Sequence, residues 1–192
     1  MPRKNLNEEM IVDVAIKLIE ETGYKEFTMR DLAARLDIKA SSLYNHVYGI
    51  AEIKSAIGSG ASKMLNTALA ESVKGKERDE AVKAATRTYR AFAKEHPELY
   101  ATIIEMPMND ENMPFSECPY SLQPLANVIG DYNITKDTLI SYFRSLMSAI
   151  HGFLELELSG YFKDKRIDIE YSYNSMIDIH LDVIRALELL NN

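Results

Sequence analysis

Apolar residues recur along this chain at steps of three and four positions, which is the spacing of one face of an α-helix. The first such segment places Ile11, Ala15, Leu18 and Ile19 on one face, and Gly23 follows as a C-terminal stop. The sequence shows neither the alternation typical of strands nor an internal repeat. We therefore expect an all-α fold.

Caps, glycines and prolines divide this pattern into separate helices. The expected helices cover roughly residues 11–22, 28–36, 39–47, 49–74, 77–95, 97–106, 121–130, 135–160 and 168–190. The segment 107–119 holds three prolines and three acidic residues, so it is expected to be a loop, either a mobile lid or a plain connection. Gly58 and Gly60 interrupt a helix, at a cost of about 1 kcal/mol each. They mark either a soft point or a place where two backbones pack closely.

Composition excludes several classes of protein. No run approaches the roughly 20 apolar residues of a membrane helix, and the first residues lack the apolar core of a secretory signal. The single cysteine, Cys118, cannot form an internal disulfide, which suits a reducing compartment. We expect a cytoplasmic protein. The net charge of −7 argues against a general nucleic-acid binder, so any DNA contact must be local.

The N-terminal helices have the pattern of a helix-turn-helix, in which two short helices follow a third. Thr28 can cap the second helix and Asp31 can answer it. Apolar residues such as Leu32, Leu36 and Leu43 lock the pair together, while the outer face of the segment after Asp37 stays short and polar. Such a face can enter a major groove about 12 Å wide.

The residues 28–47 (TMRDLAARLDIKASSLYNHV), after a helix ending in ETGYKEF, resemble the DNA-binding domain of TetR-type repressors. The resemblance covers about 47 residues of the chain. It implies a helix-turn-helix domain over residues 1–48 and a ligand-binding and dimerisation domain over 49–192. Position by position, it implies DNA contacts from Thr28, Arg30, Lys39, Ala40, Ser41, Ser42, Tyr44, Asn45 and His46.

The chain departs from that family at three positions. Asp37 replaces the usual glycine of the turn, and aspartate tolerates the left-handed conformation needed there. Tyr48, which we include among the DNA-contacting residues, stands where the family usually has a lysine that grips phosphate, and Ile50 replaces a second frequent lysine. The salt dependence of DNA binding should be shallower by roughly one unit of slope per lost charge.

The C-terminal half carries a second resemblance. Residues 89–100 resemble a section of one large branch of TetR-type ligand domains, and 146–162 resemble the segment that gives this branch its Trp-His-Gly name. Met147 stands at the tryptophan position, whereas His151 and Gly152 are retained. This resemblance implies a ligand pocket among the middle helices and a homodimer built from the last two long helices.

Apart from the resemblance, the sequence of the last two long helices also indicates a dimer, because each carries a wider apolar face than its own core requires. The alternative is that both are central helices of a monomer. Candidate pocket residues are aromatic or flexible apolar side chains, the types that line cavities for apolar ligands. They are Tyr89, Phe92, Tyr100, Ile103, Ile104, Met106, Tyr120, Phe143, Met147 and His151. Any one of them is otherwise ordinary core.

The sequence offers no catalytic or metal-binding constellation. The four histidines are scattered and none has a second ligand at metal spacing. Phosphate-binding glycine loops and serine-nucleophile motifs are missing from it, and Cys118 has no histidine close in sequence. We expect no enzyme, no cofactor and no metal.

The predicted function is therefore a dimeric repressor that binds a near-palindromic DNA operator and is released by a small, largely apolar effector. The alternative is a helical ligand- or partner-binding protein without a DNA function.

Overall fold

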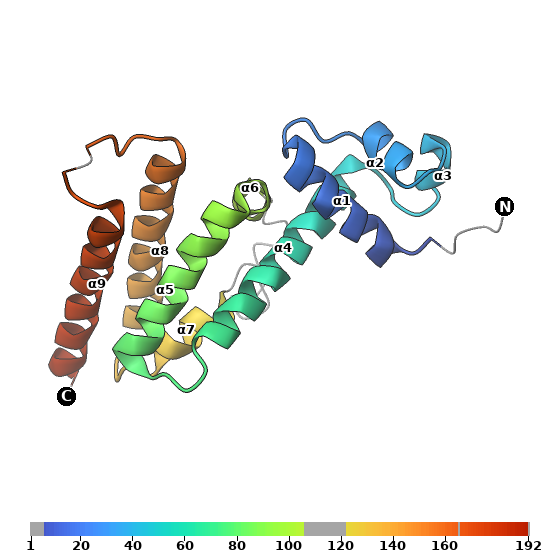
Figure 1. The fold of residues 1–192 in the computed structure, drawn as a ribbon. Helices are drawn as coiled ribbons and strands as arrows, with labels where there is room; N and C mark the ends of the chain where they lie inside the picture. Colours follow the sequence, from blue (N-terminus) through green and yellow to red (C-terminus); the bar gives the residue numbers. More distant parts are fainter. Residues whose placement is uncertain (1–5, 106–121, 165, 192) are drawn as a thin grey trace. The chain divides into compact units, whose positions relative to one another are not determined.

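The computed structural model describes residues 6–105, 122–164 and 166–191, and all regular structure in these ranges is helical (Figure 1). The helices are α1 (Glu8–Thr22), α2 (Met29–Arg35), α3 (Ala40–Leu43), α4 (Ile50–Ser72), α5 (Arg78–Glu95), α6 (Pro97–Glu105), α7 (Gln123–Gly130), α8 (Lys136–Leu158) and α9 (Ile169–Asn191). The predicted all-α class is confirmed. The predicted loop 107–119 and Cys118 lie outside the described residues. None of the described helices combines the length and the apolarity that a bilayer crossing requires.

Packing divides the described chain into two compact units. Of the described residues, the first unit holds 6–64 and 95–105, and the second holds 65–94, 122–164 and 166–191. The predicted domain boundary after residue 48 follows the end of the sequence motif, whereas packing follows contacts between side chains. As a result α4 contributes residues to both units, and α6 packs with the N-terminal helices.

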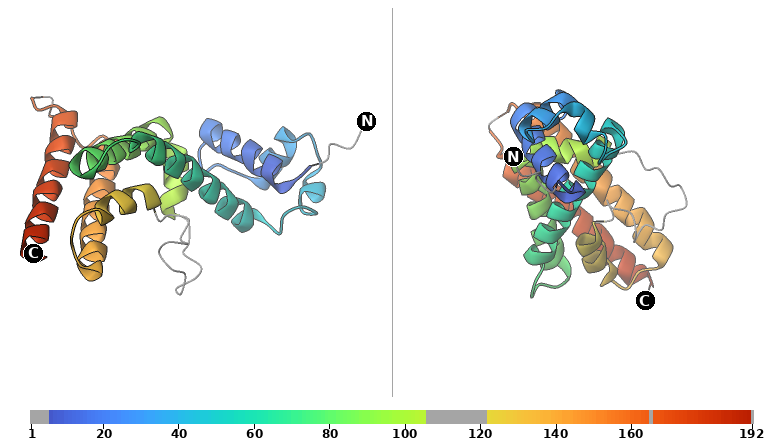
Figure 2. Two further views of the ribbon diagram at one scale, coloured as in Figure 1. Left: turned by 90° about the horizontal axis from the view of Figure 1, so that it is seen from below. Right: turned by 90° about the vertical axis from the view of Figure 1, so that its right-hand side faces the viewer.

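In the first unit, α1, α2 and α3 gather around the first half of α4 (Figure 2). Its core is formed by apolar side chains that are fully or almost fully buried, among them Ile11, Leu32, Leu43 and Ile53. A Cβ added at Gly60 would lie only 3.0 Å from Cδ1 of Ile16 and 3.7 Å from Cγ1 of Val12. This close approach of α1 to α4 favours the packing interpretation of Gly60 over the soft point.

Local signals set both ends of α1, and its C-terminal end lies where the sequence predicts. Asn7 caps the helix by accepting from the amide of Met10 at 2.9 Å. Gly23 has φ = 93°, in the region that favours glycine, and its amide donates to the Ile19 carbonyl at 2.8 Å. The predicted stop is confirmed.

The predicted helix 39–47 is shorter in the structure, where regular α-helix covers only Ala40–Leu43. Beyond it the chain tightens, because Asn45 donates to the Ser42 carbonyl and His46 to the Leu43 carbonyl, each a three-residue step. Serine, asparagine and histidine have weak helix propensity, so this segment follows the helix path without sustaining regular α-geometry.

In the second unit, α8 and α9 form an antiparallel pair, side by side in every view (Figures 1 and 2). Their bounds agree with the predicted ranges 135–160 and 168–190 to within two residues. Buried side chains from α5, α8 and α9 fill the core, including Tyr89, Leu146, Ile150 and Tyr173. The hydroxyl of Tyr173 donates to the Thr86 carbonyl at 2.7 Å, so even this buried phenol has a partner.

A nearly buried arginine ties three helices of this unit together. Arg90 on α5, only 6% exposed, makes two hydrogen bonds to Glu157 on α8, at 2.8 and 2.7 Å. It also pairs with Glu170 on α9, and Lys94 reaches Glu157 at 3.0 Å. The guanidinium carbon lies 4.9 Å from the centre of the Tyr173 ring. The charges are thus paired within the cluster rather than left unsatisfied.

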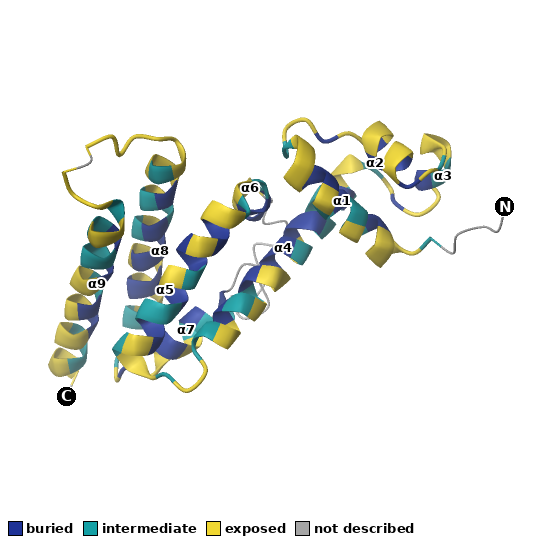
Figure 3. Ribbon diagram, viewed as in Figure 1, coloured by how far each residue is buried: buried dark blue, intermediate teal, exposed yellow. Residues whose placement is uncertain are grey.

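Large apolar side chains nevertheless remain exposed on α8 and α9, and the face of α9 that turns away from α8 is largely exposed (Figure 3). The exposed members are Ile140, Leu156, Leu158, Ile179, Val183, Leu189 and Leu190. Both helices therefore carry more apolar surface than their own unit covers.

Candidate functional site

The start of α2 is fixed by its N-cap. Thr28 accepts a hydrogen bond from the amide of Asp31 at 3.2 Å, and its hydroxyl donates to the Asp31 carboxylate at 2.5 Å. The predicted cap is confirmed. Thr28 and Arg30 are both exposed at this end of the helix.

The turn after α2 sets the direction of the following segment. Asp37 has φ = 57°, so the aspartate does adopt the left-handed conformation. Its amide donates to the Ala34 carbonyl at 3.1 Å, and the amide of Ile38 donates to the Ala33 carbonyl at 3.0 Å. The turn therefore keeps its hydrogen bonds without a glycine.

The segment from Lys39 to His46, which we call the recognition segment, is anchored by one face and exposed on the other. Leu43 is fully buried and Val47 is 3% exposed, so both face the core. The opposite face presents polar and small side chains to solvent. Lys39, Ala40, Ser41, Tyr44, Asn45 and His46 are exposed, and Ser42 is half-buried. The polar face therefore points outward, as base-edge and phosphate contacts require.

The cations near the recognition segment differ in whether a carboxylate already pairs with them. Arg35 is held by Glu21, with Nη1 at 3.1 Å from one carboxylate oxygen, and this pairing lowers the pKa of Glu21. In the part of the chain that the structure describes, no carboxylate pairs with Arg30 or Lys39. These two cations are thus free to meet phosphate groups.

A contact between α1 and α6 was not predicted. The amide of Tyr24, just after α1, donates to the Glu98 carboxylate at 2.8 Å, and His96 Nδ1 lies 2.6 Å from Glu20. From α4, Lys54 places its ammonium 4.2 Å from the centre of the Tyr24 ring. Burial and the charge of Glu105 raise the pKa of the Tyr24 phenol. No sequence signal points to these pairs, because their members lie up to 76 positions apart.

The ten predicted ligand residues fall into different parts of the structure. Tyr100 and Ile103 are buried in the first unit, whereas Ile104 is 49% exposed. A second group, with all but His151 buried, belongs to the second unit and consists of Tyr89, Phe92, Phe143, Met147 and His151. Met106 and Tyr120 lie outside the described residues.

Within the second unit, Tyr89 and His151 form the polar pair of this group. The Tyr89 hydroxyl lies 3.4 Å from His151 Nε2, and the two rings meet edge to face with centroids 5.6 Å apart. Burial lowers the pKa of His151, so its imidazole is neutral near pH 7. The pair offers hydrogen-bonding atoms among apolar side chains without a charge.

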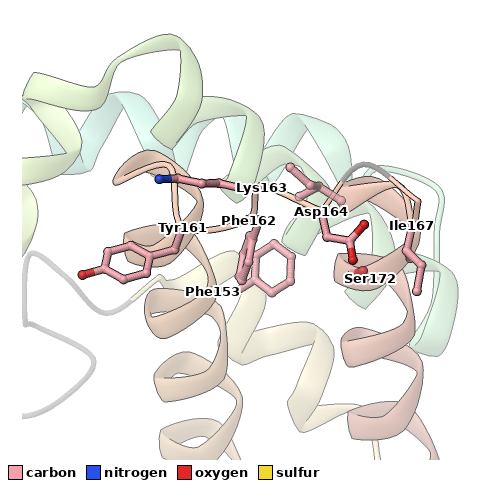
Figure 4. Close-up of a pocket in the computed structure, with 8 residues that line it drawn as sticks. Phe153, Tyr161, Phe162, Lys163, Asp164, Ile167 and Ser172 are labelled. Atoms are coloured by element: carbon pink, nitrogen blue, oxygen red, sulfur yellow. The ribbon is translucent and has the colours of Figure 1, made fainter.

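Two hollows in the second unit are lined by other residues. One, of about 280 Å³, lies at the turn between α8 and α9, with Tyr161 and Ile167 at its edges (Figure 4). The ring centroids of Phe153 and Phe162, which line it, are 4.8 Å apart. The other, of about 510 Å³, is a groove between α8 and α9. Neither contains a predicted ligand residue.

Within the described ranges, no three histidine, cysteine, aspartate or glutamate side chains gather as a metal site.

Comparison with known proteins matches both halves of the chain. The family model for bacterial regulatory proteins of the tetR family matches residues 11–46, and the model for a tetracyclin repressor-like C-terminal domain matches residues 82–180. The second match spans both segments, 89–100 and 146–162, that carry the C-terminal resemblance.

Relatives and solved structures agree with these matches. An uncharacterized HTH-type transcriptional regulator, Rv0681 of Mycobacterium tuberculosis, is 28% identical over 90% of this chain and 78% of its own length. The HTH-type regulator YobS of Bacillus subtilis is 26% identical over 81% of each chain. The structure of the regulator SCO7222, a TetR from Streptomyces coelicolor, superposes with a TM-score of 0.75 at 19% identity, over 95% of this chain and 99% of that one. At that identity the superposition shows a shared fold.

Proposed function

This chain belongs to the TetR family of bacterial regulatory proteins, and we propose that it is a homodimeric repressor of a near-palindromic operator, released by a small, largely apolar ligand. It is a DNA-binding transcriptional regulator rather than an enzyme, as its relatives are. The proposal extends this to the sign of regulation, the symmetry of the operator and the response to a ligand.

The observation that carries the proposal is the outward polar face of the recognition segment. Leu43 and Val47 hold it in place from within. Lys39 is its first residue and Arg30 lies in the first turn of α2, and among the described residues no carboxylate pairs with either cation. Serine and asparagine side chains read base edges, whereas lysine, arginine and tyrosine reach phosphates. In a dimer, two such faces about 34–36 Å apart fit successive major grooves.

The test uses a DNA duplex taken from the region upstream of the protein's own gene, with binding followed by fluorescence anisotropy at low salt. We expect Asn45→Ala to reduce sequence preference and Lys39→Ala to weaken binding to all sequences. Lys136→Ala, which removes an exposed lysine from the second unit, should leave binding unchanged. A footprint should show two half-sites. A folded wild-type protein that binds no duplex would favour the alternative, a ligand- or partner-binding protein.

The dimer is supported by the exposed apolar faces of α8 and α9. Gly152 adds a second argument, because a glycine inside a helix costs about 1 kcal/mol relative to alanine. A Cβ there would meet no described atom within 4 Å, so packing within the described chain does not account for it. Close approach of a second copy does. Light scattering should report a dimer, and Val183→Glu, which charges a side chain that is 46% exposed, should give a folded monomer.

The proposed ligand site is centred on Tyr89 and His151, with Phe92, Phe143 and Met147 as the apolar surroundings. A neutral pair in such a place favours an uncharged, mostly apolar molecule with one hydrogen-bonding group. A thermal-shift screen of such compounds should yield ligands that raise the unfolding temperature and release DNA. Tyr89→Phe should reduce their effect while leaving DNA binding intact, since Tyr89 lies in the second unit.

A further inference from the structure

The hollow at the turn between α8 and α9 is lined mostly by apolar side chains, although it lies at the surface. Phe153 is half-buried, and two neighbouring rings hold its own ring in place. The Phe153 centroid lies 4.8 Å from that of Phe162 and 5.2 Å, edge to face, from that of the buried Tyr173. Ile167 and Tyr161, at the edges, are 59% and 71% exposed. The apolar walls are thus formed in advance and remain open to solvent.

Two charged side chains, Lys163 and Asp164, also line the hollow, and they differ in whether a partner neutralises them. Arg166 places its Nε 3.0 Å from each oxygen of the Asp164 carboxylate, and this pairing lowers the pKa of Asp164. No carboxylate of the described residues lies within ion-pair distance of the Lys163 ammonium. Figure 4 shows Lys163 and Asp164 extending to opposite sides of the hollow. The uncompensated charge among the lining residues is therefore positive.

The acidic residues at the start of α9 are already engaged. Asp168 accepts from the amide of Glu170 at 3.0 Å, so its carboxylate caps the helix. Glu170 in turn pairs with Arg90. An anion that approaches the hollow therefore meets an available ammonium, whereas the carboxylates nearby already have donors.

We propose that this hollow binds a small aromatic carboxylic acid. The ring of the acid lies against Phe153 and Phe162, since aromatic rings pair favourably with one another. Its carboxylate accepts hydrogen bonds from the Lys163 ammonium, which donates but cannot accept and so selects an anion. The volume of about 280 Å³ is at the lower end of the roughly 300–1,000 Å³ typical of ligand pockets, so the acid is small.

This site is separate from the ligand site centred on Tyr89 and His151, because no residue lines both. The inference therefore goes beyond the proposed function and does not depend on DNA binding. Lys163 also argues against a second copy of the chain as the occupant. Lysine is depleted at the centre of protein interfaces, where its ammonium would lose water without gaining a partner, whereas a small acid supplies that partner.

The experiment compares cinnamate with cinnamyl alcohol, its uncharged counterpart of nearly the same shape. Isothermal titration calorimetry measures the binding of each to the full chain. We expect cinnamate to bind more tightly, with a difference that shrinks as salt concentration rises, because salt screens exposed charges. Lys163→Met should weaken cinnamate binding about fivefold, the most that an exposed ion pair contributes, and leave the alcohol unaffected. Lys136→Met, which removes an exposed lysine outside the hollow, is the matched control.

The aromatic wall is tested by Phe162→Ala, which should weaken the binding of both probes roughly fivefold through loss of the ring contact. Tyr48→Ala, which removes an exposed aromatic ring from the first unit, should change neither. Tyr89→Phe, in the other proposed ligand site, should leave cinnamate binding intact. Circular dichroism spectra that match the wild type ensure that each variant is compared in its folded state.

Several results would overturn the inference. These are a folded wild-type protein that does not bind cinnamate, equal affinity for the acid and the alcohol, and cinnamate binding that Lys163→Met leaves unchanged. Loss of cinnamate binding in Tyr89→Phe but not in Phe162→Ala assigns the acid to the other site. A change of oligomeric state in Phe162→Ala, seen by light scattering, assigns the hollow to a protein interface. Failure of the chain to bind DNA would refute the proposed function and leave these measurements unaffected.

Discussion

Replacing Arg90 with methionine tests whether the buried charge cluster of the second unit stabilises the fold through pairing. The side chains of Arg90 and Glu157 are each 8% exposed, so Arg90→Met leaves the Glu157 carboxylate buried, with Lys94 at 3.0 Å as its remaining charged partner among the residues that the structure describes. Breaking a buried pair by removing one partner costs about 3–5 kcal/mol. We expect the lower end, about 3 kcal/mol, because Lys94 stays and the half-exposed Glu170 can turn to water.

The assay is thermal unfolding followed by circular dichroism at one fixed protein concentration, since the proposed dimer would make the midpoint depend on concentration. For a chain of this length, about 3 kcal/mol corresponds to a decrease in Tm of roughly 6–12 °C. The double variant Arg90→Met with Glu157→Leu removes the stranded charge and should recover most of the loss, as apolar replacement of buried pairs does elsewhere. A Tm decrease of only about 2 °C in the single variant would refute the argument.

The pH dependence gives a second check. In the wild type, burial raises the pKa of Glu157, but hydrogen bonds from Arg90 and Lys94 outweigh burial and hold this pKa below its ordinary value. Its stabilising contribution is therefore present above the pKa of the unfolded state and lost as pH falls through the folded-state pKa. Without Arg90, burial dominates and raises the folded-state pKa of Glu157 above its unfolded-state value. The folded protein then loses stability as pH rises through that raised pKa, because the buried carboxyl must ionise. The stability deficit of Arg90→Met should thus be small near about pH 4 and grow toward about pH 7; a deficit that does not vary with pH contradicts this.

Three further predictions concern substitutions at single positions. Gly152→Leu should convert the dimer to a folded monomer in light scattering, whereas Gly130→Leu, where a Cβ also meets nothing within 4 Å, should leave the dimer intact. Asp37→Gly should raise the free energy of unfolding by about 0.5 kcal/mol, because relief of left-handed strain exceeds the entropic cost of glycine; a lowered Tm would show that the carboxylate itself stabilises the turn. Thr28→Ala should lower stability by about 1 kcal/mol through loss of the N-cap, while Thr28→Ser should retain most of it in chemical denaturation.

The features that sequence reasoning located correctly are those with a local cause. Gly23 ends α1 and Thr28 starts α2 because a cap involves residues within four positions of each other. The same holds for Asp37, whose short polar side chain is one of the few that tolerate a positive φ. Helical periodicity locates the long helices for a similar reason, since the apolar face is written into every turn.

The features that sequence reasoning missed depend on pairing between distant segments. Nothing at Arg90 distinguishes it from an exposed helix arginine, yet it is buried between carboxylates that lie 67 and 80 positions away. The proposed ligand residues differ in burial in the same unpredicted way, since Ile104 is 49% exposed whereas Tyr100 and Ile103 are buried. An aromatic or apolar residue on a helix carries no local mark that separates a cavity wall from ordinary core or from surface. The choice is made by the neighbouring helices.

The grouping of α6 with the N-terminal helices bears on how a ligand would act on DNA binding. The Glu98 carboxylate holds the amide of Tyr24, and the Tyr24 ring lies against Lys54 of α4. The loop that leads into Thr28 and α2 is therefore held by α6 and α4 together. If a ligand moved α6, the displacement would act on this loop directly. The charge-assisted hydrogen bond from the Tyr24 amide to Glu98 would either break or move Tyr24 together with α6. Only five positions separate Tyr24 from Met29, the first residue of α2. The recognition segment would therefore shift with the loop, and no bending of α4 would be needed. A rigid α4, with Gly60 serving close packing against Ile16, is then sufficient, and the mechanism does not require a soft point at Gly58 or Gly60.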